Sequence, residues 1–345
     1  MIIIHQPAEI VGVLNPVALH VQSANPVLLL KIEIESAYGA GDFDVVHIAD
    51  GSAAPTGECV FYLDAILRSN LEYDLPSLAA PVLCVNLCKR YRLFIAELAT
   101  DDTPDNADFT QVFEGYALLA GFEPEWFVLN QIPRRGNVLG AYPLARSVER
   151  EFVSFITLIY PTEGTQTIEL SAPGFNETIS ITTGKWQPVI VPIDISSTDA
   201  LAVLVNTVAP IVLYPFTNIM RPNVVRIVFY DRQGACNILP CAGDTTITHE
   251  VEQTEFNQYV PYNYGSTERK KSAFNRQVAK VYKVNSGYLP PDTLQAASHV
   301  FGSEDGAWMI APDNRLIPIV VRNASPVILQ SDLPLGLVIE FEIAQ

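Results

Sequence analysis

The sequence has little charge of either sign. Only 17% of its 345 residues are Asp, Glu, Lys or Arg, whereas 49% are hydrophobic. Such a composition is typical of a folded chain, and it leaves fewer solvated side chains than a freestanding enzyme usually carries. We therefore expect other subunits to cover part of the surface.

Basic residues are the scarcer of the two signs. The 21 lysines and arginines stand against 38 acids, which gives a formal net charge of -17. Because phosphate binding requires a basic face, this balance argues against nucleic acid as a direct partner. The two short basic runs, Pro133 to Arg135 and Glu268 to Lys271, are interpreted as solvated loops.

Long hydrophobic runs are also missing. The longest, Ala200 to Phe216, is interrupted by polar residues and prolines and predicts two buried strands around a turn. The first eleven residues have no basic n-region, and their apolar run is short. We expect no signal peptide, no membrane partner and synthesis in the cytoplasm.

Cysteine is rare, and its spacing does not suit a metal. The count of five is odd, and without a signal peptide we expect reduced thiols. Three residues separate Cys84 from Cys88 and four separate Cys236 from Cys241, whereas zinc knuckles usually have two. On one strand, Cys84 and Cys88 would lie about 13 Å apart, too far for one ion. We interpret these cysteines as buried thiols.

Catalytic motifs are absent. The run from His249 to Gln253 begins like a zinc-protease helix but lacks the second histidine, and its alternation predicts a strand. Gly184 and Lys185 precede Trp186 rather than the Ser or Thr of a phosphate loop. Neither G-x-S-x-G nor G-x-G-x-x-G occurs. The histidines are scattered, at His5, His20, His47, His249 and His299.

Acidic clusters support two weaker hypotheses. Glu123 and Glu125 flank Trp126, as in a sugar site or in an exposed loop that anchors one hydrophobic side chain. Four aspartates between residues 101 and 108 lack the glycine and spacing of an EF-hand and are interpreted as a linker. The glycosylation sequons at Asn176 and Asn323 mean little without secretion. We predict no catalytic, cofactor-binding or metal residues and no cofactor.

Strand periodicity dominates the chain. Residues 28 to 36, LLLKIEIES, place Leu28, Leu30, Ile32 and Ile34 on one face and charged residues on the other. Similar runs recur between Gly, Pro, Asn and Asp clusters, and the 25 prolines suit strand ends and turns. The fold class is therefore mainly β, with tandem β-sandwich-like modules and a small C-terminal α+β unit.

The predicted organisation has four segments. Residues 1–100 form an N-terminal β-sandwich-like domain with a helical turn at LDAILRS, and residues 101–109 an acidic linker. Residues 110–225 form a central β-rich domain, and residues 226–345 a β-meander followed by a β-α-β-β-β unit. The helix of this unit, the only clear one in the chain, starts near Pro291 and ends at Gly302.

The order of these elements resembles a family. A D-x-x-G turn joins two strands at residues 231–234, VNSGY ends a strand at residues 284–288, and a turn at residues 303–305 follows the helix. This run is similar to the C-terminal part of structural proteins of tailed bacteriophages, particularly those infecting Bacteroidetes-type hosts. The resemblance is looser over the first 100 residues and supplies no active-site residues.

The resemblance implies a non-enzymatic virion structural protein of the tail or baseplate. Such a subunit forms a homo-oligomeric ring or tube with other virion proteins and is made in the host cytoplasm. The first alternative is a glycan- or receptor-binding sandwich at a tail tip or cell surface, with Trp126, Trp186 and Trp308 as candidate platform residues. The second alternative is a hydrolase.

Overall fold

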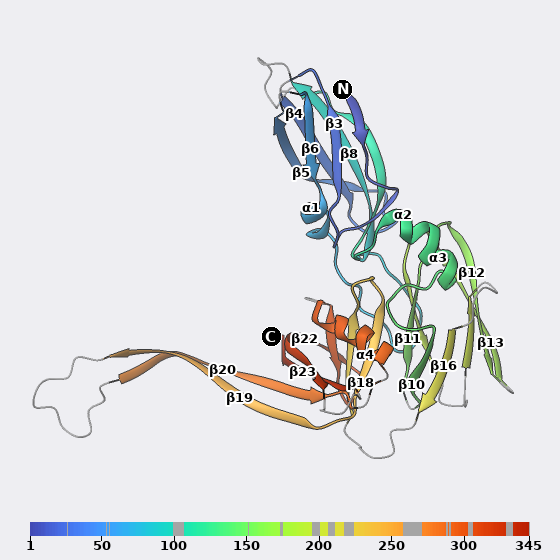
Figure 1. Ribbon diagram of the computed structural model, residues 1–345, viewed down its shortest axis with the longest axis vertical. Helices are drawn as coiled ribbons and strands as arrows, with labels where there is room; N and C mark the ends of the chain where they lie inside the picture. The colour runs from blue at the N-terminus through green and yellow to red at the C-terminus, as the bar shows by residue number, and fades with distance from the viewer. Residues whose placement is uncertain are drawn as a thin grey trace, which may run out of the picture. The chain divides into compact units, whose positions relative to one another are not determined.

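The computed structural model is mainly β (Figure 1). It describes residues 1–25, 27–52, 54, 56–98, 107–150, 152–172, 175–194, 201–205, 211–216, 224–257, 271–287, 289, 291–302, 306–328 and 334–344. The chain divides into two compact units. The first is Met1–Ile219 with Phe229–Ile238, and the second is Met220–Val228 with Leu239–Gln345.

Two sheets of the first unit form an N-terminal sandwich. Its smaller sheet has the order β1 (Ile2–His5), β3 (Ala18–Gln22) and β6 (Glu58–Tyr62). Its larger sheet has the order β2 (Ile10–Gly12), β9 (Thr110–Leu118), β8 (Cys88–Leu98), β4 (Val27–Glu35) and β5 (Phe43–Ser52). A Cβ added at Gly51 of β5 would meet the side chains of Cys59 and Phe61 on β6, so the sheets pack closely there.

The alternation predicted for β4 is confirmed, with one correction. Leu28, Leu30, Ile32 and Ile34 are all buried. Glu35, expected on the solvated face, is also buried, and its carboxylate accepts hydrogen bonds from the Arg90 guanidinium at 2.6 and 3.1 Å. The predicted helical turn after β6 is present as α1 (Asp64–Arg68).

A second sandwich lies in the same unit. One sheet has the order β10 (Ala145–Glu149), β16 (Ile211–Phe216), β15 (Leu201–Val205), β12 (Gly164–Ala172) and β13 (Phe175–Thr183). The other contains β11 (Ser154–Leu158), β14 (Val189–Ile193) and β7 (Val82–Leu83). Residues of both sheets share one core, including Val148, Leu158, Leu170, Val191 and Leu213. The two strands expected between Ala200 and Phe216 are β15 and β16, which pair antiparallel.

The three predicted modules stay a prediction, and the observed units do not follow their boundaries. β7 precedes the predicted linker yet pairs with β14 in the second sandwich. β9 follows the linker yet pairs with β8 in the first. Residues 101–106 of that linker, the basic run at 268–270 and the turn at 303–305 lie outside the described residues.

One helical segment contradicts the strand prediction for residues 110–225. It runs through α2 (Pro124–Trp126), a π-helical turn (Phe127–Gln131) and α3 (Ile132–Arg135). Pro124 lies at a helix start, where the missing N–H is harmless, so here it begins a helix rather than ending a strand. The run Pro133 to Arg135, predicted to be a loop, is therefore part of α3. Gly136, at φ 60°, ends the segment in the left-handed conformation.

A seven-stranded sheet contains most strands of the second unit. Its order is β18 (Cys236–Cys241), β17 (Val225–Tyr230), β21 (Ala307–Ile310), β22 (Leu316–Ile328), β23 (Pro334–Ile343), β20 (Lys271–Asn285) and β19 (Thr245–Asn257). The predicted β-α-β-β-β unit is confirmed as β20, α4 (Pro291–Ala297) with a 3-10 turn (Ser298–Gly302), β21, β22 and β23. Among the described helices, none is long and apolar enough to cross a membrane.

The predicted β-meander is wrong. β18 and β19 are consecutive in sequence, yet they lie at opposite edges of this sheet. β19 instead pairs antiparallel with β20 along its whole length. Alternating residues identify strands but not their partners, which explains the error.

We expect the Glu35–Arg90 pair to make folding sensitive to acid. Burial raises the pKa of Glu35, but hydrogen bonds from Arg90 and from the backbone of Gly41 and Gly39 outweigh it and lower the pKa overall. Stability from this pair is therefore complete above the unfolded-state pKa of about 4.3 and is lost as the pH falls through the lower folded-state pKa. Glu35→Gln should lower the free energy of unfolding by about 2 kcal/mol at pH 7 and flatten its decline below about pH 5.

Glu114→Gln is the matched control for denaturant titrations at several pH values. Glu114 pairs with Arg92 at 2.9 Å on the same sheet, but its side chain is 37% exposed. Its loss should change the free energy of unfolding by about 0.5 kcal/mol or less. Equal effects of the two substitutions on the free energy of unfolding would show that Glu35 is not the source of the acid sensitivity.

Candidate functional site

The D-x-x-G turn between β17 and β18 is a densely hydrogen-bonded polar feature of the first unit. Asp231 is only 1% exposed. Its Oδ1 accepts hydrogen bonds from the backbone N–H groups of Gln233 (2.9 Å) and Ala235 (3.1 Å). Its Oδ2 accepts from Ala141 N–H (2.8 Å) and Asn237 Nδ2 (3.2 Å). These four donors use the carboxylate as a structural acceptor.

The same turn contacts several parts of the first unit. Gly234 adopts φ +81°, which closes the turn. The Arg232 carbonyl accepts from Gly121 N–H at 2.7 Å, and Gln131 Nε2 donates to Gln233 Oε1 at 3.0 Å. Cys236 N–H donates to the Thr157 hydroxyl at 2.9 Å. The turn is therefore fixed from both sandwiches and from the helical segment.

Asp74, which lies much earlier in the chain, contacts the residue that precedes this turn. The Tyr230 hydroxyl donates to the Asp74 carbonyl at 2.7 Å. The Asp74 carboxylate accepts from the backbone N–H groups of Asn86 (2.9 Å) and Leu87 (2.8 Å). No sequence motif marks Asp74, because its partners follow twelve and thirteen residues later in the chain.

The thiols are buried and protonated. All five cysteines are free and buried. Burial raises the pKa of Cys84 and of Cys236 well above the ordinary thiol value, and the negative charge of Asp74 adds to the effect at Cys84. β7 ends at Leu83, so Cys84 and Cys88 do not share the single strand on which their separation was predicted. Among the described residues, no group of three or more His, Cys, Asp or Glu side chains could hold a metal.

The structure brings together one cysteine from each of the two pairs, which the sequence did not predict. Cys84 and Cys236 come from different predicted modules, yet they are close enough for Cys236 to add electrostatically to the raised thiol pKa of Cys84. Both lie in the first unit. A thiolate, which zinc binding requires, is disfavoured at both positions by burial.

The remaining polar candidates do not converge. His249 and Glu250 are exposed on β19, and Glu250 accepts a hydrogen bond from Arg322 of β22. Glu123 and Glu125 are exposed at the start of the helical segment. The acid of a glycosidase usually lies in a buried environment, whereas both of these side chains are exposed.

The tryptophans do not form an aromatic platform. Trp186 is 2% exposed and packs against Phe127, with ring centroids 6.4 Å apart. Trp308 is 8% exposed, on β21. Trp126 alone of the three is exposed, at 48%, beside the exposed Leu129. Two of the three residues proposed for glycan binding are therefore unavailable at the surface.

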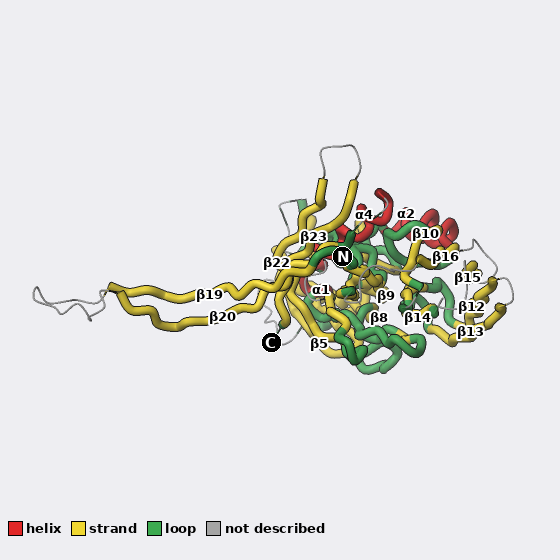
Figure 2. Tube along the Cα trace, turned by 90° about the horizontal axis from the view of Figure 1, so that it is seen from below, coloured by secondary structure: helices red, strands yellow, loops and turns green. Residues whose placement is uncertain are grey.

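A long β-arm extends from the second unit. β19 and β20 pair from Thr245↔Val284 to Asn257↔Lys271, and both views show them running far beyond β22 and β23 (Figures 1 and 2). β23 pairs with β20 only at Val281–Asn285. Among the described strands, the rest of the arm is a ribbon of two strands with both edges open.

The base of this arm is fixed by side chains. Arg322 on β22 donates to Glu250 on β19 and to Glu342 on β23, the latter at 2.8 Å. Lys283 donates to Glu340 at 2.7 Å, and the rings of Tyr282 and Phe341 stack with centroids 5.2 Å apart. The arm is thus attached to the sheet by the pairing of β20 with β23 at Val281–Asn285 and by these salt bridges. Its outer part has no third strand in the described structure.

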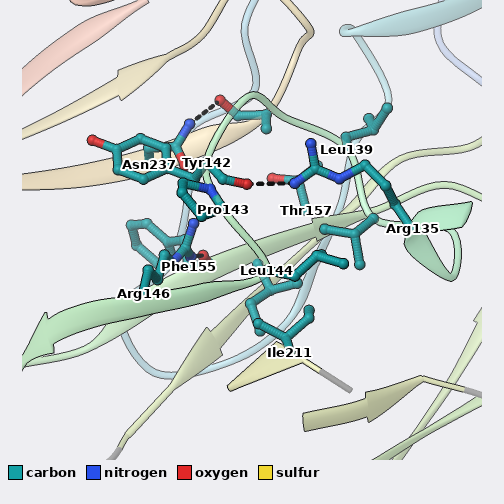
Figure 3. Close-up of a pocket in the computed structure, with 13 residues that line it drawn as sticks. Arg135, Leu139, Tyr142, Pro143, Leu144, Arg146, Phe155, Thr157, Ile211 and Asn237 are labelled. Carbon is teal, nitrogen blue, oxygen red and sulfur yellow. Dashed lines mark hydrogen bonds between the residues drawn. The ribbon is translucent and has the colours of Figure 1, made fainter. Parts of the chain in front are cut away.

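A small cavity in the first unit is lined by two arginines (Figure 3). Arg135 of α3 donates to the carbonyls of Gly140 and Tyr142. Arg146 of β10 donates to the Phe155 carbonyl at 2.7 Å. Burial lowers the pKa of both guanidinium groups. No sequence motif marks either arginine as a site residue.

The comparisons with known proteins give only weak likenesses. No family model and no curated protein matches the chain. A protein in the tail of an empty gene transfer agent particle with C6 symmetry has 13% identity and a TM-score of 0.23, over 34% of this chain and 90% of its own. A protein in the virion of a native gene transfer agent particle has 13% identity and a TM-score of 0.22, over 35% and 91%.

A third solved structure covers more of the chain but is less similar. It is the BSP domain of a biofilm-associated protein, with 10% identity and a TM-score of 0.18 over 78% of this chain and 60% of its own. TM-scores this low do not establish a shared fold or a family. The Bacteroidetes-type hosts named by the sequence resemblance stay a prediction.

We expect the Asp231 carboxylate to be essential for the fold of the first unit. Asp231→Ala removes the shared acceptor of four N–H donors in a buried or half-buried environment and should lower the free energy of unfolding by about 3 kcal/mol, measured by denaturant titration. The control is Asp313→Ala in the exposed turn between β21 and β22, where Asp313 pairs with Arg315. An Asp231→Ala chain as stable as the control would contradict the structural role of this turn.

Proposed function

We propose that this chain is a non-enzymatic structural subunit of a tailed-phage-type virion. It assembles with copies of itself into a ring or tube of the tail or baseplate, alongside other virion proteins. The observation that carries the proposal is the β19–β20 arm, whose outer part is a ribbon of only two strands in the described structure. The sequence resemblance to tail and baseplate proteins supplies the kind of particle.

An isolated two-stranded ribbon is marginally stable in water, so this arm needs a partner. Residues 271–280 of β20 lie beyond its pairing with β23 and span about 34 Å at the rise of an antiparallel strand. Over that length each open edge presents unpaired backbone N–H and C=O groups. Pairing with a strand of a neighbouring copy satisfies those groups.

The charge of the two strands favours a copy of the same chain. The sequence of β19 has three glutamates and no lysine or arginine, whereas that of β20 has four basic residues and no acid. The arm therefore has one acidic strand and one basic strand. Joining the acidic edge of one copy to the basic edge of the next gives a head-to-tail contact, which closes into rings or extends into tubes.

Other features of the composition support assembly rather than catalysis. The smaller sheet of the N-terminal sandwich exposes Ile2, Ile4, Val60 and Tyr62 on β1 and β6, with Tyr62 71% exposed. Apolar surface of this kind is suited to burial between subunits. The net charge of -17 gives a lumen that repels passing DNA.

Removing the outer arm tests the proposal. The variant deletes residues 251–278 and joins Glu250 to its pairing partner Ala279 through an Asn-Gly turn, which keeps the base of the arm. We expect the full chain to form oligomers of defined size by native mass spectrometry, and the variant to stay monomeric with an unchanged thermal midpoint.

The matched control shortens a different hairpin in the same way. Deleting residues 171–176 and joining Leu170 to its partner Glu177 through the same turn trims the β12–β13 hairpin. This control should assemble like the full chain. Assembly of the arm-deleted variant to the same oligomer, or a monomeric full chain at every concentration, would overturn the proposal.

A further inference from the structure

The edge strands of the described sheets differ in how they resist pairing with another chain. Among them, β5, β13 and β19 alone have more than six residues, with 10, 9 and 13. Long edge strands usually carry charges, prolines or bulges that restrict the addition of a further strand. β5 has the exposed Asp44 and Asp50 and a register shift against β4. β19 has three glutamates, which favour a basic partner, and a register shift against β20.

The remaining long edge strand, β13, has little of this protection. It pairs with β12 from Gly164↔Thr183 to Ala172↔Phe175 without a register shift. Its sequence, FNETISITT, has no proline, lysine or arginine, and its one charged residue, Glu177, lies near its start. Both views show β13 at the rim of its sheet (Figures 1 and 2). An uncharged, regular edge rich in β-branched residues is well suited to accept a further strand.

The two faces of β13 define the strand that would fit beside it. Ile179 and Ile181 are half-buried and pack against the core of the second sandwich. The opposite face is exposed and consists of hydroxyl side chains, Thr178, Ser180 and Thr182. It continues onto β12, where the hydroxyls of Thr165 and Thr182 are hydrogen-bonded at 3.0 Å. A strand that extends both faces has apolar side chains on one side and small uncharged polar side chains on the other.

The end of this edge is fixed by contacts within the first unit. Gly184, which follows β13, donates its N–H to Gln187 Oε1 at 3.0 Å. The Tyr38 hydroxyl donates to the Lys185 carbonyl at 2.5 Å, and a Cβ added at Gly184 would meet the Tyr38 ring. A strand that is already held in place loses less conformational freedom when a partner binds.

We propose that the β13 edge binds an extended segment of another protein, which adds to this five-stranded sheet as a further strand. The segment alternates apolar side chains, beside Ile179 and Ile181, with hydroxyl or other small uncharged side chains. Backbone hydrogen bonds supply the affinity and the alternation supplies the specificity. The site lies in the first unit and does not involve the arm, so it is independent of the proposed self-assembly.

Binding of a synthetic strand to the full chain tests the proposal. The probe is a fluorescently labelled peptide that alternates isoleucine and threonine over the length of β13. We expect a saturable rise in its fluorescence anisotropy. The same peptide with every second amide N-methylated cannot hydrogen-bond along an edge and should not bind. No binding of the first peptide, or equal binding of both, would overturn the proposal.

A charge introduced on β13 assigns the binding to this edge. Ile179→Lys places an ammonium group where a paired strand would bury it, and should weaken peptide binding by about tenfold or more. The control is Ile48→Lys on the edge strand β5, where the side chain is 52% exposed. It should bind the peptide like the unmodified chain. Binding that is unchanged in a folded Ile179→Lys chain would contradict the assignment.

Hydrogen exchange of the unmodified chain gives a test that does not depend on a variant folding. Adding the peptide should slow exchange about tenfold or more at the amides of residues 178–183 that face away from β12, and leave β5 and β19 unchanged. Slowing at β5 or β19 instead would refute the site. Slow exchange at these β13 amides before the peptide is added would show that a second copy covers the edge, and would overturn the proposal of a different partner.

Discussion

The first unit depends on one buried carboxylate. Asp231 brings together backbone donors from its own turn and from Ala141, while its neighbours Arg232 and Gln233 bind Gly121 and Gln131. Those partners belong to the N-terminal sandwich, the helical segment and the entry to the second sandwich. An apolar residue at position 231 would remove the acceptor of the turn's own backbone N–H groups and of Ala141 N–H, and the turn that presents Arg232 and Gln233 to their partners would lose its support.

The arm of the second unit illustrates the opposite constraint. A ribbon of two strands has no core, and its backbone is half unpaired along each edge. Salt bridges and a stacked aromatic pair fix its base, but they do not extend along it. A protein that maintains such an element gains stability for it only when another strand is added. Under the proposed function, a strand added by a neighbouring copy completes the hydrogen bonding of this arm.

Local patterns in the sequence predicted most strands and the C-terminal helix. The alternation of β4 and the start and end of α4 with its 3-10 turn follow from residues a few positions apart. Partners that are distant in sequence could not be predicted in this way. β19 was expected beside β18 but pairs with β20, and Glu35 was expected in solvent but is buried against Arg90.

The candidate sites show the same limit. The sequence identified residues 231–234 as a turn but could not indicate that the turn is buried and bonded to Gly121, Gln131 and Ala141. The arginine cavity arises because α3 and β10 bring Arg135 and Arg146 together, and the helical segment that places Arg135 was itself missed. Excluding the zinc-protease motif required only the absent second histidine, since it depended on a local spacing.

An electron cryomicroscopy map of the assembled full chain would show directly how the arm meets neighbouring subunits. We expect a closed ring or tube in which a strand of a neighbouring copy is hydrogen-bonded to an open edge of the β19–β20 arm. A map in which the subunits meet only through other surfaces, with both arm edges facing solvent, would contradict it.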